Sequence, residues 1–224
     1  MRPILLLNLA LSVAAAVAVS GCATESHRSL APPAVASHGT AYSGPRYKLV
    51  IGKFQNRSTY MQGIFSDGTD RLGSQAKTAL MGHLQQTGRF TLVDRANMDE
   101  IAFEADVSGR RQQLTGAEVA VTGDVTEFGR RNTGDVQAFG LLGAGAKQTA
   151  YAKVVLNIVD VRTSQVLYSA FGAGEYALSN REIAGFGSTA GYDATLNGKV
   201  LDLAIREAVN RLVEGLENGS WSPT

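Results

Sequence analysis

The sequence predicts an α+β fold, in which a mixed β-sheet flanked by helices carries two β-hairpins. Between Tyr47 and Phe128, short apolar runs alternate with segments in which apolar residues recur at helical spacing. Between Arg130 and Asn197, apolar and polar residues instead alternate with a period of two, which is typical of strands with one face in water. The first part therefore predicts a layered domain, and the second predicts hairpins that extend from it.

The first 21 residues have the features of a secretory signal peptide. An early arginine precedes an apolar run from Ile4 to Val19, and the only cysteine of the chain, Cys22, follows shortly after this run. The run is short for a transmembrane helix and ends in small residues. The segment Val-Ser-Gly-Cys that ends at Cys22 resembles the bacterial lipobox, in which the cysteine becomes the first residue and carries acyl chains. We therefore expect residues 1–21 to be removed and Cys22 to be lipidated.

Residues 22–45 predict a lipidated N-terminus followed by a flexible, extended tether, because they are rich in Ala, Ser and Pro and lack sustained periodicity. Ala23 occupies the position at which an aspartate would resemble the signal for inner-membrane retention, so sorting to the outer membrane is favoured. Each buried CH₂ group of an acyl chain contributes about 0.8 kcal/mol, so several chains anchor a protein firmly. The folded domain, residues 46–224, is then expected in the periplasm of a Gram-negative bacterium.

The charge of the mature chain argues against a nucleic-acid partner. The full sequence has 21 Lys and Arg residues and 20 Asp and Glu residues, and removal of residues 1–21 takes away one arginine and no acidic residue. The mature chain is thus formally neutral, whereas nucleic-acid binding requires a basic excess or a basic stripe.

The layered part begins with a largely buried strand, Tyr47 to Gln55. A helix with a capping residue at Asp67 is then expected to end at Gly88, and a short strand follows from Phe90 to Val93. Asp94 and Asn97 predict the start of a further helix, with an apolar stripe formed by Met98, Ile101, Ala102 and Ala105.

The second half predicts further strands and a closing helix. A strand from Glu118 to Phe128 is followed by a buried hairpin, Tyr151 to Val161 and Gln165 to Ala170, which turns through Arg162, Thr163 and Ser164. Gly198 to Glu217 has the apolar stripe of an amphipathic helix, which more often contacts a core than a membrane.

Two candidate membrane hairpins, residues 134–154 and 170–196, are rich in Gly and Ala and poor in bulky aliphatic residues. Such segments pack poorly inside a domain but suit a strand between lipid and water, and a membrane strand needs only about 9–11 residues. The residues expected to face lipid are Ala150, Ala152, Tyr176, Leu178, Phe186, Ala190, Tyr192, Ala194 and Leu196.

The sequence offers no pattern typical of catalysis. The three histidines are scattered, without a second ligand at metal spacing. The interval between Gly140 and Gly145 resembles a phosphate-binding loop, but Ala146 occupies the position of its lysine. Ser74 and Lys77 match the Ser-x-x-Lys motif of penicillin-binding enzymes without the other motifs of those enzymes. We therefore expect no enzymatic activity, no catalytic residue, no metal and no cofactor.

Three segments together resemble the CsgG/HfaB family of curli-type outer-membrane secretion lipoproteins: Leu92 to Met98, Val121 to Gly129 and Val159 to Val166. The resemblance extends from about Tyr47 to Leu216. It implies a periplasmic α/β domain whose copies form a ring, with two hairpins from each copy in one shared transmembrane β-barrel. A membrane β-sheet must close because its edges cannot be left unpaired in lipid, which agrees with this expectation.

The resemblance also implies a function and partners. The expected function is an oligomeric pore that passively exports unfolded subunits of a curli-like fibre or adhesin, with outer-membrane lipid and accessory secretion factors as further partners. In the curli channel, aromatic residues of the loop after the first strand narrow the pore, which implies this role for Tyr60 and Phe65. The alternative is a soluble periplasmic binding module without a pore, similar to the lipoprotein activators of penicillin-binding proteins.

Overall fold

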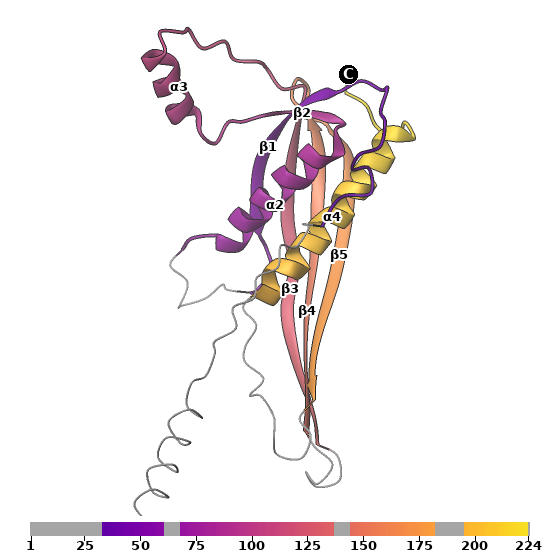
Figure 1. The fold of residues 1–224 in the computed structure, drawn as a ribbon. Coiled ribbons are helices and arrows are strands. Elements are labelled where there is room, and N and C mark those ends of the chain that lie inside the picture. The colour runs from indigo at the N-terminus through magenta and orange to yellow at the C-terminus, as the bar shows by residue number, and fades with distance from the viewer. Residues whose placement is uncertain (1–32, 61–67, 137–143, 182–194, 224) are drawn as a thin grey trace, which may run out of the picture. The chain divides into compact units, whose positions relative to one another are not determined.

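Five strands form a mixed sheet in the order β2-β1-β3-β4-β5, with helices α2 and α4 packed on it (Figure 1). The structure is a computed structural model, which describes residues 33–60, 68–136, 144–181 and 195–223 of the 224. Residues 34–224 form one compact unit. The elements in chain order are β1 (Tyr47–Asn56), α2 (Arg71–Thr87), β2 (Phe90–Val93), α3 (Met98–Val107), β3 (Val119–Val136), β4 (Ala144–Asp160), β5 (Val166–Arg181) and α4 (Thr195–Glu217).

The strand directions confirm the predicted mixed sheet. Strand β1 lies between β2 and β3 and is parallel to both, whereas β3, β4 and β5 are antiparallel neighbours. The predicted turn between the last two strands is also confirmed. Asp160 accepts hydrogen bonds from the backbone N–H groups of Arg162 and Thr163 at 2.9 and 2.7 Å, and Ser164 adopts a positive φ of 61°.

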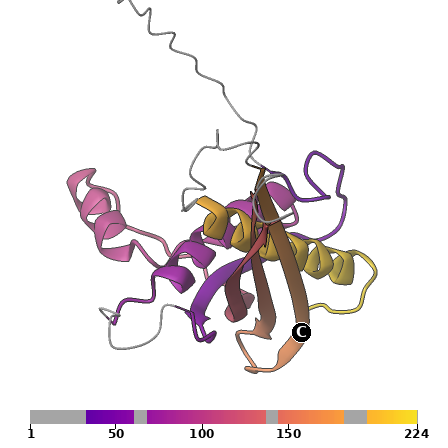
Figure 2. The same cartoon turned by 90° about the horizontal axis from the view of Figure 1, so that it is seen from below.

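The core lies between one face of the sheet and the helices α2 and α4 (Figure 2). Alternate residues of the strands and one stripe of each helix are fully covered, including Leu49, Val121, Leu156, Ile158, Leu80, Leu84, Ile205 and Leu212. His83 is also buried, and its Nε2 atom lies 2.8 Å from Oδ1 of Asp202, so it joins α2 to α4. His83 is therefore part of the core.

Helix α4 lies directly on the backbone of β5 because β5 has glycines where the two elements cross. A Cβ atom at Gly172 would collide with the carbonyl oxygen of Ala204. At Gly174 a Cβ atom would lie 3.0 Å from the carbonyl oxygen of Val200, which is tight but less severe. These glycines therefore set the distance between the helix and the sheet.

The ends of the helices differ in part from the sequence prediction. The N-cap of α2 is Asp70, whose carboxylate accepts a hydrogen bond from the backbone N–H of Gly73 at 2.7 Å. The predicted cap, Asp67, lies outside the described residues. Gly88 ends α2 in the left-handed conformation, as predicted. Helix α4 begins at Thr195 rather than at Gly198.

Within the described residues, no helix covers the opposite face of the sheet. Its second set of alternate side chains includes an apolar row that crosses all five strands, formed by the paired residues Val93, Val50, Ala120, Val159 and Val166. Val166 is 60% exposed, and Phe171, which lies further along β5, is 58% exposed. We call this surface the bare face.

Helix α3 stands away from the sheet and from the other helices (Figures 1 and 2), and none of its residues is buried. The expected helix is therefore confirmed, but the expectation that the helices flank the sheet holds only for α2 and α4. The side chains of Ile101, Phe103 and Val107 are 41, 66 and 68% exposed. An amphipathic pattern predicts an apolar stripe but does not identify the surface that covers it.

The segment Ala34–Pro45 packs on the domain, although the sequence predicts a flexible tether to residue 45. Val35 is only 3% exposed, and the backbone N–H of Ala36 donates a hydrogen bond to Asn210 of α4 at 2.9 Å. We call this segment the strap. The described residues 34–45 are therefore not part of a flexible tether.

Candidate functional site

Strands β3, β4 and β5 continue past the N-terminal end of α4, well beyond the layered part of the domain (Figure 1). They contain 18, 17 and 16 residues, compared with 10 for β1 and 4 for β2. Strands of globular proteins usually have about 5–6 residues. We call the ends of these strands, Phe128–Val136, Ala144–Ala152 and Gly174–Arg181, the strand extension, whose first residues in the domain still lie under the first turns of α4.

The strand extension contains the described part of both predicted hairpins. The first is a hairpin of β3 and β4, paired from Val119 with Asp160 to Val136 with Ala144. Its strands are continuous with those of the domain, whereas the sequence predicts a separate strand that begins at Gly134. Of the second, residues 170–181 belong to β5 and residues 182–194 lie outside the described residues. Thr195 and Leu196 belong to α4 rather than to a strand.

Three of the residues predicted to face lipid are instead covered within the chain. Ala150 and Ala152 of β4 are 0 and 1% exposed, and α4 packs against β4 and β5. Leu196 is fully buried in the first turn of α4, so its assignment to a lipid-facing strand is wrong. The strand alternation is correct at Ala150 and Ala152, but the sequence does not reveal that a helix reaches this far along the face.

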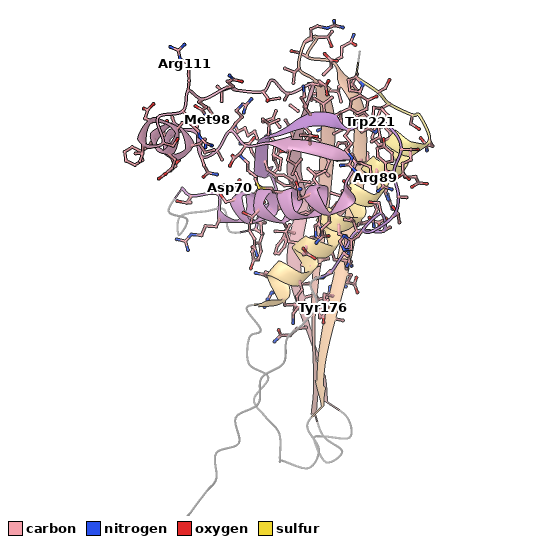
Figure 3. All side chains as sticks on the ribbon, turned by 45° about the horizontal axis from the view of Figure 1, so that its top comes forward. Asp70, Arg89, Met98, Arg111, Tyr176 and Trp221 are labelled. Atoms are coloured by element: carbon pink, nitrogen blue, oxygen red, sulfur yellow. The ribbon has the colours of Figure 1, made fainter. Side chains whose placement is uncertain are left out.

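Tyr176 lies at the edge of the covered region (Figure 3). It pairs with Ala150 across the sheet and is 40% exposed, and Nζ of Lys199 in α4 lies 5.4 Å from the centre of its ring. Leu178 is placed in β5 by the backbone. The remaining predicted lipid-facing residues, Phe186, Ala190, Tyr192 and Ala194, lie outside the described residues.

A polar cluster fixes the start of the strand extension to α4. Arg130 of β3 donates a hydrogen bond from Nε to Oδ1 of Asn197 at 2.6 Å, and Nδ2 of Asn197 donates to the hydroxyl of Tyr60 at 2.7 Å. The ring of Tyr60 packs against Phe128, with 4.6 Å between ring centres. The cluster thus joins β3, the first turn of α4 and the chain that follows β1.

The same cluster closes the base of the loop that the sequence associates with a pore constriction. Asn56 donates from its side chain to the carbonyl oxygen of Tyr60 at 2.8 Å and from its backbone N–H to Asp70 at 2.7 Å. Tyr60 is therefore held at the base of this loop through its backbone, ring and hydroxyl. Phe65, the second predicted constriction residue, lies outside the described residues.

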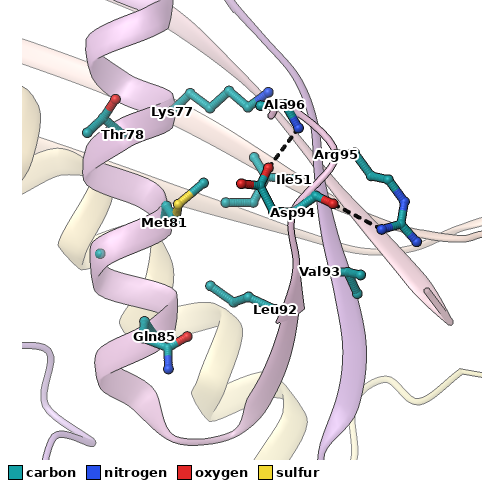
Figure 4. A pocket seen from close by; sticks show the side chains of 11 residues that line it. Ile51, Lys77, Thr78, Met81, Gln85, Leu92, Val93, Asp94, Arg95 and Ala96 are labelled. Carbon is teal, nitrogen blue, oxygen red and sulfur yellow. Dashed lines mark hydrogen bonds between the residues drawn. The ribbon is translucent and has the colours of Figure 1, made fainter. Parts of the chain in front are cut away.

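A second polar cluster fixes the base of the α3 segment (Figure 4). The carboxylate of Asp94 accepts hydrogen bonds from the side chain of Asn97 at 2.6 Å and from the backbone N–H of Ala96 at 2.7 Å, and these bonds lower the pKa of Asp94. Arg95 donates to the carbonyl oxygens of Asp94 and Thr115, so it joins the two ends of the segment. A cavity of about 460 Å³ lies beside this cluster, between α2 and β2, and is lined mainly by apolar side chains such as Met81 and Leu92.

A third cluster holds the strap through Arg89, whose side chain is 5% exposed. Its guanidinium donates to the carbonyl oxygens of Ser37 and Thr40 at 3.3 and 3.2 Å, pairs with Glu217 at 2.7 Å and lies over the ring of Tyr42 at 4.8 Å. Burial is the main cause of a raised pKa of Tyr42, and Arg89 opposes this effect. The sequence does not indicate that Arg89 holds the strap, because its partners lie about 50 and 130 positions away and belong to common residue types.

Within the described residues, no group of three or more His, Cys, Asp or Glu side chains is arranged to hold a metal ion. No helix in this part of the chain is long and apolar enough to cross a membrane. What the clusters have in common is position: each fixes a segment that projects from the domain or joins it to the N-terminus. The three clusters therefore tie the projecting segments and the strap to the layered domain.

Comparison with known proteins identifies the class of protein to which this arrangement belongs. Residues 36–223 match the family described as curli production assembly/transport component CsgG. The chain belongs to the CsgG family, and the resemblance seen in the sequence is confirmed. A protein of Neisseria meningitidis serogroup B that carries a lipoprotein designation is 63% identical over 210 residues, which cover 94% of each chain.

The similar solved structures are more distant in sequence. A PelC dodecamer from Paraburkholderia phytofirmans is 14% identical, with a TM-score of 0.35, over 81% of this chain and 93% of that chain. Lipoprotein GNA1162 from Neisseria meningitidis is 18% identical, with a TM-score of 0.34, over 78% of this chain and 99% of that chain. The C-terminal domain of LpoB from Salmonella enterica is 15% identical, with a TM-score of 0.31, over 61% of this chain and 86% of that chain.

Proposed function

We propose that the protein is an outer-membrane lipoprotein whose copies form a ring, with the strand extensions joined in one transmembrane β-barrel that exports unfolded protein subunits. Membership of the CsgG family supports this proposal. The observation that carries it is the strand extension. Beyond Arg130, Ala150 and Tyr176, where α4 begins to cover the sheet, the described strands continue through residues 131–136, 144–149 and 177–181. A membrane strand of about 9–11 residues would be completed by the adjoining residues 137–143 and 182–194.

The edge of the sheet explains why a ring would be required. Strand β5 is an edge strand of the described sheet, and its backbone groups in the strand extension would face lipid if one copy entered the membrane alone. Each unpaired backbone group in hydrocarbon costs several kcal/mol. Pairing with residues 182–194 and with neighbouring copies would remove this cost.

The polar and apolar sides of the strand extension are consistent with one face in lipid and one in water. The side that continues from the covered face carries Ala150 and Tyr176, with Arg130 bonded to Asn197 of α4, whereas the other side carries Tyr151 and Glu175. Just before the strand extension, this second side carries the ion pair of Lys153 and Glu127 at 2.8 Å. We propose that the charged side lines the pore, that Leu178, Phe186, Ala190, Tyr192 and Ala194 face lipid, and that Phe65 contributes to the constriction.

The test is the oligomeric state and conductance of the full-length protein extracted in detergent. The proposal predicts a large ring that conducts ions in planar lipid bilayers. A monomer without conductance would contradict it and would favour the alternative of a soluble periplasmic binding module, such as an activator of penicillin-binding proteins.

A pair of variants tests the orientation of the second hairpin. Ala190→Arg places a charge on the proposed lipid side and is expected to cost about 2–4 kcal/mol if the residue lies near the membrane midplane. Thr189→Arg introduces the same side chain on the other side of the strand and serves as the matched control. Ring assembly should fall for Ala190→Arg alone, and equal assembly of the two variants would contradict this orientation.

A further inference from the structure

We propose that helix α3 of one copy docks on the bare face of the next copy, so that the ring is held together in the periplasm by exchanged helices. This inference rests on the proposed ring, and it names the surfaces that join its copies. Two surfaces carry it, neither of which is covered by another helix among the described residues: helix α3, and the bare face, whose apolar row is half-buried at its centre and exposed at Val166. A sheet normally buries such a face against helices.

The chain topology indicates that the bare face is the position suited to α3. Strands β1, β2 and β3 are parallel, with β1 in the middle, and α2 connects β1 to β2 across the covered face. The connection from β2 to β3 contains α3 and passes over β1, in the direction opposite to that of the connection from β1 to β2. Because such crossovers are right-handed in about 98% of cases, α3 is expected on the opposite face, which is the bare face.

In this chain α3 is held away from that position. The hydrogen bonds of Asp94 fix the turn before α3, and Arg95 joins the two ends of the segment through Thr115. Met98 and Arg111 accordingly project far from the sheet (Figure 3). In the part of the chain that the structure describes, no helix occupies the place that the topology provides for α3, which is the condition for exchange of identical elements between copies.

The dimensions of the two surfaces match. In a crossover position the helix axis runs back along the strands, and a helix with its side chains is about 10–12 Å wide, so it covers two to three strands that lie about 4.8 Å apart. The stripe of Met98, Ile101, Ala102 and Ala105 would therefore cover the centre of the row, around Ala120. Because helix and face are different surfaces, the contact is head-to-tail and leads to a ring when its rotation closes.

The charges favour a protein surface over a membrane as the partner of α3. The helix carries Asp99, Glu100, Glu104 and Asp106 and no basic residue, so it would be repelled by anionic lipid. Part of the charge near the bare face is neutralised by ion pairs between its own side chains. Arg57 pairs with Asp124 at 3.0 Å, and Lys153 pairs with Glu127 at 2.8 Å. An acidic helix can approach such a face without strong repulsion.

The experiment uses a cysteine pair in the full-length, detergent-extracted protein. With Ala102→Cys and Ala120→Cys in the same chain, oxidation should give a ladder of disulfide-linked multimers on a non-reducing gel. Each single variant should give dimers at most. The control pair, Ala102→Cys with Arg211→Cys on α4, should give no ladder. The only native cysteine, Cys22, is present in every variant.

The other outcomes are distinct. An internal disulfide, seen as a monomer of increased mobility, would show that α3 folds onto its own sheet and would overturn the inference. A ring of normal mass without a ladder would overturn this interface but leave the proposed pore intact. If the native protein itself is monomeric by light scattering, the proposed function fails as well.

A substitution on α3 provides a second readout. Ile101→Asp should abolish the ring while leaving the melting temperature of the monomer unchanged, because no residue of α3 is buried in its own chain. Glu104→Ala, on the polar side of the same helix, should leave the ring intact. A full ring for Ile101→Asp would contradict the inference.

Discussion

Arg89 shows how one side chain determines the path of the chain between the N-terminus and the domain. It follows the glycine that ends α2, and its guanidinium lies between the strap, Tyr42 and Glu217. The partners come from opposite ends of the sequence. A buried guanidinium with several hydrogen-bond acceptors orders the strap more firmly than an apolar contact alone, because unpaired carbonyl groups would be left if the strap moved.

Arg89→Ala should lower the free energy of unfolding by about 3 kcal/mol, because it leaves carbonyl groups of the strap and the carboxylate of Glu217 without their donor. Urea denaturation followed by circular dichroism measures this change. The matched control is Arg211→Ala, which removes an exposed pair with Glu207 and should change the value by less than about 1 kcal/mol. Equal effects of the two substitutions would show that Arg89 does not anchor the strap.

Tyr60 has a structural role that can be separated from a role in the pore. Tyr60→Phe removes the hydroxyl that accepts the hydrogen bond from Asn197 and should lower the free energy of unfolding by about 1 kcal/mol. Conductance should not change, because the ring still packs against Phe128. Phe65→Ala, by contrast, should raise conductance if Phe65 narrows the pore. A conductance change for Tyr60→Phe with unchanged stability would contradict this division of roles.

At the scale of the element, the contact between α4 and β5 depends on the absence of side chains. Gly172→Ala should lower the free energy of unfolding by about 3 kcal/mol, since its Cβ would collide with the backbone of α4. Gly174→Ala adds the same atom where the helix backbone is further away and should cost less. Urea denaturation of both variants measures the difference, and a smaller effect at Gly172 than at Gly174 would contradict the close approach.

Periodicity was sufficient to predict most elements, because their apolar stripes face a core in the same chain. This holds for α2, for the β4–β5 hairpin and for most of α4. The start of α4 was missed because residues 185–196 also fit a period of two, and local alternation cannot exclude a helix. The full length of β3 was missed because Gly129 and Arg130 interrupt its apolar pattern, although the backbone pairing with β4 continues through them.

The parts of the candidate site that the sequence did not reveal depend on contacts between distant positions. The strap contains the prolines and small residues of a linker, and nothing in its composition identifies Arg89 or Asn210 as partners. Asn197 joins Tyr60 to Arg130 although 67 positions separate it from Arg130 and 137 from Tyr60. The pattern of α3 predicted a helix but not its distance from the sheet.

At the scale of the whole molecule, the strap limits how far the domain can lie from the lipid anchor proposed at Cys22. About a dozen residues separate Cys22 from the buried Val35. Even a fully extended chain of that length spans only about 40 Å. A lipidated copy therefore stays close to the membrane surface, and its strand extension remains within a short distance of the lipid.

The short tether confines the proposed assembly of the ring to the membrane surface. Copies held on one surface meet by diffusion in two dimensions, where their effective concentration far exceeds the value in free solution. Cys22→Ser, which is exported but not lipidated, should therefore remain monomeric at total concentrations at which the lipidated protein forms rings, as native mass measurements of the two forms would show. Rings of equal abundance in the two forms would contradict this view. If the prediction holds, the buried strap acts during assembly by keeping new subunits at the membrane surface, where their neighbours are found.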